Sequence, residues 1–378
     1  MSVFRSRPAL RWLVPAAAAF VVIGGGAAAG TLVANADPAL PARSAAQLLV
    51  DLQTARPAGL SGTVVETADL GLPALPGLTG TQGDANLTKL IAGSNTARVW
   101  YAGQDKVRLS LIGTLGETDV VRNGTDLWMW RSVDNTATHT KISADAGRLE
   151  SGAAPMAATP QEAASAALAA IDPTTAVTTT GSARVAGRDA YELVLAPKDT
   201  TSLIGQVRLA VDAKQHIPLR VDVYAKGANN PAVRIAFQQV SFSVPAAQQF
   251  TFNPPAGAKV TTENPAADAG KALTPQSGEG MAKHPLKPAG TPADARNTKT
   301  IGTGWTSILV SKAPGGSDSG AIPQQFAGVL NSLPKVSGSW GSGRLLSSSL
   351  FSALLTDDGR ILVGAVTPQA LYTAAASK

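Results

Sequence analysis

The stretch VRNGTDLWMWRS, residues 121–132, places two tryptophans in one short segment directly after an Asn-Gly pair. Asn-Gly is favoured in two-residue β-hairpin turns, so the residues that follow it are predicted to leave the turn as a strand. Successive side chains of a strand point to opposite faces, and Trp128 and Trp130 therefore share a face. If Arg131, near the strand end, marks the outward face, both indoles point inward.

Two indoles on one inward face either fill a solid core or line an apolar hollow. The strand predicted to lie beside them offers only three aliphatic side chains, Val107, Leu109 and Leu111. Rings of this size do not interdigitate as small aliphatic side chains do, which favours a hollow. Solid packing is the alternative hypothesis.

A long apolar segment, residues 70–91, precedes this pair of strands and contains one pair of opposite charges. A loop this apolar is expected either to be buried or to act as a lid. Leu72, Leu75 and Leu78 are predicted to reach into the hollow as parts of a lid.

The surrounding sequence contains about a dozen short segments, most of which alternate apolar and polar residues as half-buried strands do. Turn sequences separate several of them, at residues 103–106, 187–189 and 212–215. So many strands with few helices between them predict one large antiparallel sheet that curls.

Two helices are predicted from their first residues. Ser44 with Gln47 three residues later forms a capping box, and the apolar positions that follow share one face until Pro57. A second capping box begins at Thr159, with Pro160 at the first helical position.

The composition excludes several classes of function. Lys and Arg exceed Asp and Glu by only 32 to 26, which argues against a nucleic-acid partner. The chain has no Cys, and its three histidines, His139, His216 and His284, are far apart, so no metal site is expected. No nucleophile with a matching base is found. The sequence therefore predicts a binding protein without catalytic residues or cofactors, not an enzyme.

Residues 1–36 combine a basic start, a long apolar run and the small-residue pattern Ala34-Asn35-Ala36. These are the features of a secretory signal peptide, so the chain is predicted to be exported. The apolar run approaches the length of a membrane span, and an uncleaved N-terminal membrane anchor is the alternative.

Three further parts follow this segment. Residues 37–262 hold the predicted sheet, residues 263–298 form a linker rich in Pro, Ala and Gly, and residues 299–378 read as a small α+β module. In that module the strand after Asp357-Asp358-Gly359 is apolar on both faces. A module this small is expected to cover only one of them, and Leu362 on the other is predicted to dock a partner.

The order of several segments resembles the LolA family of lipoprotein carriers and its RseB-like relatives. VVRNGTDLWMW (120–130) is similar to the family's D-G-x-x-L-W-x-Y hairpin, and VAGRDAYELVLAPKD (185–199) is similar to its Y-x-L-x-L-x-P strand. FTFNPPAGAKV (250–260) is similar to the closing F-x-P-P-x-G strand. The resemblance covers roughly residues 42–260. The carriers' basic R-P-x-x-F-R-W strand is absent, with ARVWYAGQDKVRLSL (97–111) in its place.

The resemblance implies a mainly β fold, an unclosed antiparallel half-barrel with covering helices and a cavity for acyl chains. It implies that this cavity is lined by Tyr101, by the three aliphatic residues of the neighbouring strand and by both indoles. The function expected from it is binding of lipid or lipoprotein acyl chains in the cell envelope. The missing carrier strand and the additional module favour an alternative, an RseB-like stress sensor that restrains an anti-sigma factor through protein contacts only.

Overall fold

The computed structural model describes residues 40–72, 92–113, 116–142, 159–169, 171–263, 298–312 and 332–377. The N-terminal segment 1–36, most of the lid segment with Leu75 and Leu78, and nearly all of the linker lie outside the described residues.

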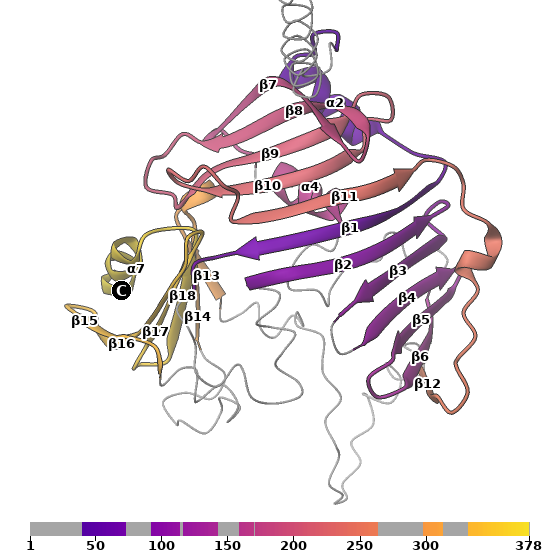
Figure 1. The fold of residues 1–378 in the computed structure, drawn as a ribbon. Helices are drawn as coiled ribbons and strands as arrows, with labels where there is room; N and C mark the ends of the chain where they lie inside the picture. Colours follow the sequence, from indigo (N-terminus) through magenta and orange to yellow (C-terminus); the bar gives the residue numbers. More distant parts are fainter. Residues whose placement is uncertain are drawn as a thin grey trace, which may run out of the picture.

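Two antiparallel sheets form most of the described chain (Figure 1). The larger sheet has the strand order β12-β6-β5-β4-β3-β2-β1-β11-β10-β9-β8-β7, and its one parallel pair among these strands is β12 with β6. Its strands are β1 (Leu60–Asp69), β2 (Ala92–Tyr101), β3 (Lys106–Ile112), β4 (Glu117–Asn123), β5 (Asp126–Arg131), β6 (Thr136–Lys141), β7 (Thr175–Val185), β8 (Arg188–Pro197), β9 (Ile204–Asp212), β10 (Pro218–Ala225), β11 (Val233–Ser241) and β12 (Lys259–Glu263). This unclosed, curved sheet confirms the predicted half-barrel.

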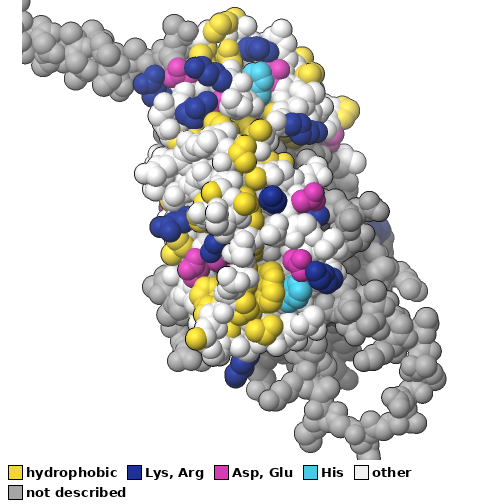
Figure 2. All heavy atoms as spheres, turned by 90° about the vertical axis from the view of Figure 1, so that its right-hand side faces the viewer, with side chains coloured by type: hydrophobic (Ala, Val, Ile, Leu, Met, Phe, Trp, Pro, Cys, Tyr) yellow, Lys and Arg dark blue, Asp and Glu magenta, His cyan; other side chains and the backbone are white. Residues whose placement is uncertain are grey.

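Charged side chains of both signs are interspersed on the side of the molecule where the connection between β11 and β12 runs (Figure 2).

One carboxylate of the larger sheet, Asp222, is fully buried and is paired with arginines. Its carboxylate accepts hydrogen bonds from Arg234 at 2.6 and 3.0 Å and lies 3.0 Å from Nε of Arg220. Arg220 also pairs with Glu192. The opposite charges offset the cost of burying this carboxylate.

Both predicted helix starts are confirmed. Helix α2 (Ala45–Thr54) begins at a complete capping box, in which Ser44 and Gln47 satisfy each other's backbone N–H groups. Helix α4 (Pro160–Ala169) begins with proline, and the Thr159 hydroxyl accepts from the Glu162 N–H at 3.2 Å. The short 3₁₀ helix η2 (Ala247–Phe250) occupies a position where a further strand was predicted.

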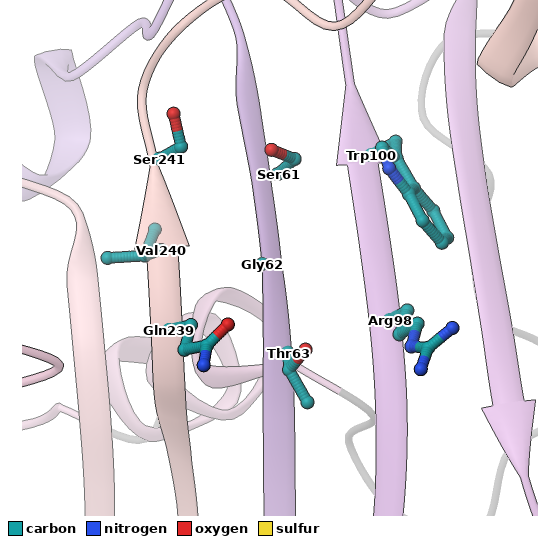
Figure 3. A pocket seen from close by; sticks show the side chains of 8 residues that line it. All are labelled: Ser61, Gly62, Thr63, Arg98, Trp100, Gln239, Val240 and Ser241. Carbon is teal, nitrogen blue, oxygen red and sulfur yellow. The ribbon is translucent and has the colours of Figure 1, made fainter.

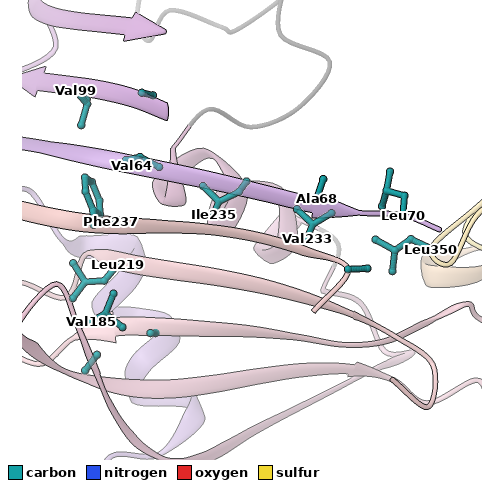
Figure 4. Close-up of a cluster of buried hydrophobic side chains, with 14 residues drawn as sticks. Val64, Ala68, Leu70, Val99, Val185, Leu219, Val233, Ile235, Phe237 and Leu350 are labelled. Atoms are coloured by element: carbon teal, nitrogen blue, oxygen red, sulfur yellow. The ribbon is translucent and has the colours of Figure 1, made fainter. Parts of the chain in front are cut away.

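The pairing register assigns every side chain of the larger sheet to one of two faces. We call the face on which α2 and α4 pack the helix face, and the opposite one the outer face. On β1 the helix face carries Glu66 together with Val64 and Ala68, and the latter two belong to the buried apolar cluster in Figure 4. The outer face carries Ser61 and Thr63, which appear in Figure 3.

The helices cover the part of the helix face formed by β7 to β11. Leu48 and Leu52 of α2 and Ala164 of α4 are buried there against large aliphatic side chains of the sheet. Those side chains are Leu193, Leu195, Val207, Leu209, Val211 and Val221.

In the described residues, the C-terminal module contains a six-stranded sheet on which helix α7 (Pro368–Ala376) packs. Its strand order is β13-β14-β18-β17-β16-β15, and α7 packs on β17 and β18. The strands are β13 (Thr298–Ile301), β14 (Ile308–Lys312), β15 (Lys335–Gly338), β16 (Gly341–Ser347), β17 (Ser352–Thr356) and β18 (Arg360–Gly364), and the 3₁₀ helix η4 (Gly304–Thr306) joins β13 to β14.

The predicted docking role of Leu362 is wrong. Leu362 is completely buried with Leu354 and Leu371, because its face of β18 is the one that α7 covers. The opposite face of this sheet carries Leu309, which is paired with Val363 and 47% exposed. Among the described residues, Leu309 is thus the exposed large apolar side chain of this sheet, on the face opposite to Leu362.

The module is attached to the larger sheet at three points. The N–H of Leu203 donates to the carbonyl of Ala365 at 2.9 Å, and the N–H of Ser349 donates to the carbonyl of Leu70 at 2.8 Å. The indole N–H of Trp305 donates to the hydroxyl of Thr175 at 2.8 Å. Leu350 of the module is buried in the main apolar cluster of the half-barrel.

Replacing Leu362 with Lys is expected to unfold the C-terminal module, because the change buries an unpaired charge. The expected loss is at least about 3 kcal/mol in the free energy of unfolding, measured by chemical denaturation of the full chain. Leu309→Lys in the neighbouring strand is the control and should have little effect. Equal stability of the two variants would contradict the assignment of the faces.

Candidate functional site

The two indoles lie on the outer face, not on the face of the predicted hollow. In the register Leu109 pairs with Val120, and Val120 pairs with Met129, so these three side chains share the helix face. Trp128 and Trp130 alternate with Met129 and therefore point the other way. The prediction failed because it took the exposed Arg131 as a marker of the outer face. Arg131 lies on the helix face at the end of its strand.

The connection between β11 and β12 covers the indoles. Phe250 of η2 is fully buried where η2 contacts β3 and β4. The ring of Phe252 lies 5.3 Å from that of Trp128 and 6.5 Å from that of Trp130, and Trp128 also stacks on His139 at 4.3 Å. The tryptophan pair is thus part of a small solid core on the outer face, which was the alternative hypothesis.

The helix face of β3 to β5 carries a set of apolar side chains that are not fully buried. Five of them are half-buried and Met129 is 41% exposed. On the outer face of the same strands, Ser110, Asp119 and Val121 are buried. We call the accessible set the apolar strip, and it consists of Val107, Leu109, Leu111, Val120, Leu127 and Met129.

The apolar strip holds one charged side chain. Arg122 lies between Val107 and Leu127 in the cross-strand register and is only 2% exposed. Its Nε donates to the carbonyl of Gly124 at 3.2 Å, and its Nη2 lies 3.4 Å from a carboxylate oxygen of Asp105, which is itself 72% exposed. This contact is long for an ion pair that should offset the burial of a guanidinium.

A buried carboxylate lies on the same face, on β1. Glu66 is 7% exposed between Val64 and Ala68, and one of its oxygens accepts from the side-chain amide of Asn95 at 3.3 Å. The other oxygen is buried without a hydrogen-bond partner in the part of the chain that the structure describes. Burial raises the pKa of Glu66 above its usual range, and the hydrogen bond from Asn95 opposes this shift.

The structure therefore separates the predicted cavity residues. Tyr101, Val107, Leu109 and Leu111 share the helix face, and Leu72 packs against the apolar cluster next to them. The two indoles lie on the other face. Sequence reasoning missed Val120, Leu127, Met129, Arg122 and Glu66 as members of the helix face. Most of them could have been found from the sequence. Starting at Leu109, every second residue of a strand shares its face, and the hairpin turns give the facing residues on the next strand.

Comparison with known families agrees with this fold. Residues 123–256 match the sequence model of the MucB/RseB N-terminal domain. Over these residues the chain is similar to the RseB-like proteins.

Several solved structures are similar to the chain. MucB in its complex with MucA from Pseudomonas aeruginosa is 18% identical, over 88% of this chain and 96% of that chain, with a TM-score of 0.42. LprF from Mycobacterium bovis is 14% identical, over 57% and 97%, with a TM-score of 0.29. A LolA superfamily protein from Nitrosomonas europaea is 12% identical, over 56% and 99%, with a TM-score of 0.23. A search of curated proteins found no match.

Two other kinds of site were sought in the described ranges. No group of three or more His, Cys, Asp or Glu side chains there could hold a metal ion. None of the helices described is both long and apolar enough to cross a membrane.

Trp128→Ala is expected to lower the free energy of unfolding by up to about 3 kcal/mol, less than for a fully buried ring because Trp128 is only half-buried. The ring contacts with Phe252 and His139 are lost, which urea denaturation measures. Binding of a fluorescent fatty acid should change little, and Trp128→Phe should keep most of the stability. If Trp128→Ala instead abolished fatty-acid binding without lowering stability, the indole would belong to the ligand site.

Glu66→Gln is expected to stabilise the protein at neutral and higher pH. Since the folded state raises the pKa of Glu66, the favourable contribution of its neutral form is complete below the unfolded-state pKa. That contribution is lost as the pH rises through the folded-state pKa. Glutamine keeps the neutral form at every pH, so denaturation curves of the two proteins should separate only as the pH rises. Glu192→Gln, which removes the ion pair with Arg220, should instead destabilise the protein. Parallel stability profiles for wild type and Glu66→Gln would contradict the burial effect.

Proposed function

We propose that the helix face of the half-barrel binds the acyl chains of a lipid or of a lipoprotein, outside the cytoplasm and without catalysis. The observation that carries the proposal is the apolar strip. Five of its six apolar side chains are half-buried, and the sixth, Met129, is 41% exposed. Contiguous accessible apolar surface on a soluble domain marks an interaction site.

Flexible hydrocarbon fits this surface better than a rigid partner does. The strip runs across three neighbouring strands and consists of branched aliphatic side chains and one methionine, which adapt to many shapes. Leu72 and Tyr101 flank it on the same side of the sheet, and the segment that holds Leu75 and Leu78 is proposed to close over it. Arg122 lies buried among these apolar side chains and is not part of their accessible surface.

An RseB-like regulator is the second candidate, because the family that matches residues 123–256 is named for MucB and RseB. MucB has been solved in complex with MucA. In this role the chain would restrain an anti-sigma factor through protein contacts, and the uncovered face of the module around Leu309 would be the place to look for them.

Native mass spectrometry of the purified full chain, followed by organic extraction, distinguishes the two candidates. Acyl binding predicts co-purified lipid and uptake of a fluorescent fatty acid. Met129→Lys places a charge on the strip at an exposed position and should reduce uptake at least tenfold without unfolding the protein. Leu111→Trp should also reduce uptake, because the larger indole would occupy space beside the strip that an acyl chain needs.

Val133→Lys is the matched control, since Val133 is 68% exposed in the turn between β5 and β6 and lies outside the strip. Its uptake should equal that of the wild type. A wild-type protein that carries no lipid and takes up no fatty acid would refute acyl binding and favour the regulator.

A further inference from the structure

A second hollow, on the outer face, is separate from the apolar strip. It spans β11, β1 and β2 and has a volume of about 350 Å³, in the lower part of the range for small-molecule sites (Figure 3). The side chains that line it lie in two rows, and each row takes one side chain from each of the three strands. The rows are Ser241–Ser61–Trp100 and Gln239–Thr63–Arg98.

The hollow follows from side-chain size along these rows. The central strand contributes two small side chains, Ser61 and Thr63, and longer ones rise from the flanking strands. Gly62 lies between them, where a β-carbon would come within 2.5 Å of the Gln239 carbonyl. The register between β1 and β11 shifts between Thr63 and Val64, and such an irregularity bends and twists the strand next to the hollow.

The indole of Trp100 is held in place before any ligand arrives. The guanidinium of Arg108 lies 5.4 Å from the centre of the ring, and Arg108 in turn pairs with the buried Asp119 at 2.5 Å. A fixed indole beside polar groups can stack on the C–H face of a sugar ring while its neighbours bind the hydroxyl groups. The hydroxyl groups of the serines and threonine and the amide of Gln239 are such neighbours.

Arg98 adds a charge to this lining. It is exposed, no carboxylate lines the hollow, and Arg98 forms no ion pair with any residue that the structure describes. A guanidinium in this position favours a carboxylate on the ligand, which it can bind through two parallel hydrogen bonds.

We propose that the hollow formed by β11, β1 and β2 binds an acidic saccharide, with the sugar ring against Trp100 and its carboxylate on Arg98. The site is independent of the proposed acyl site, because the two lie on opposite faces of the same sheet. An acyl chain would find little apolar surface here, since five of the six side chains in the two rows are polar.

Saturation-transfer NMR on the full chain tests the proposal, with glucuronate as the probe and glucose as its neutral counterpart. Glucuronate is expected to bind more tightly than glucose. Arg98→Gln should weaken glucuronate binding about tenfold, to the level of glucose, and leave glucose binding unchanged. Trp100→Phe, which keeps a ring under Arg108, should weaken both sugars.

Arg184→Gln is the control, because Arg184 is an exposed arginine that pairs with Asp189 away from the hollow. It should change neither sugar's affinity. Arg98→Gln should also leave fatty-acid uptake unchanged, so this test fails or succeeds independently of the acyl site. The proposal would be overturned if neither sugar bound, or if Arg98→Gln and Trp100→Phe both left sugar binding unchanged. It would also be overturned if acetate competed as strongly as glucuronate.

Discussion

The packing of Phe250 and Phe252 against the outer face of β3 to β5 is the contact on which the arrangement of the half-barrel depends. Strand β5 carries large apolar side chains on both faces, Trp128 and Trp130 on one and Leu127 and Met129 on the other, and both faces therefore gain from a cover. The connection between β11 and β12 provides the cover over the indoles of Trp128 and Trp130. The helices α2 and α4 pack on β7 to β11 and do not cover β3 to β5. The apolar strip is what this distribution of covers leaves accessible.

Strand β1 connects the other features. Its helix face carries the buried Glu66, its outer face forms the floor of the polar hollow, and the residue that follows it, Leu70, contacts the C-terminal module. A glycine at position 62 is required in the middle of the strand, because both the Gln239 backbone and the Phe237 ring occupy the space of a side chain. One strand thus supports two candidate binding surfaces and the junction with the module.

Local signals in the sequence were sufficient for the elements. The capping residues Ser44 and Thr159 mark true helix starts, and Asn123-Gly124 forms the expected turn. The choice of face was not predictable in the same way. Alternation tells which residues share a face, but not which face is covered. Trp128 is covered by the β11–β12 connection, which is distant in sequence, and Leu362 is covered by α7, which follows its strand directly.

The pairing of β1 with β11 also has a consequence for the order in which the sheet assembles. Strands β2 to β6 follow β1 as consecutive hairpins and can form as the chain is synthesised, but Ser61 must wait for Ser241. Closing so long a loop slows folding, since its entropic cost comes before the contacts that reward it. Until β11 arrives, one side of β1 is a bare edge with unpaired backbone groups. That edge is where premature pairing between two chains would begin, and where a chaperone would act to best effect.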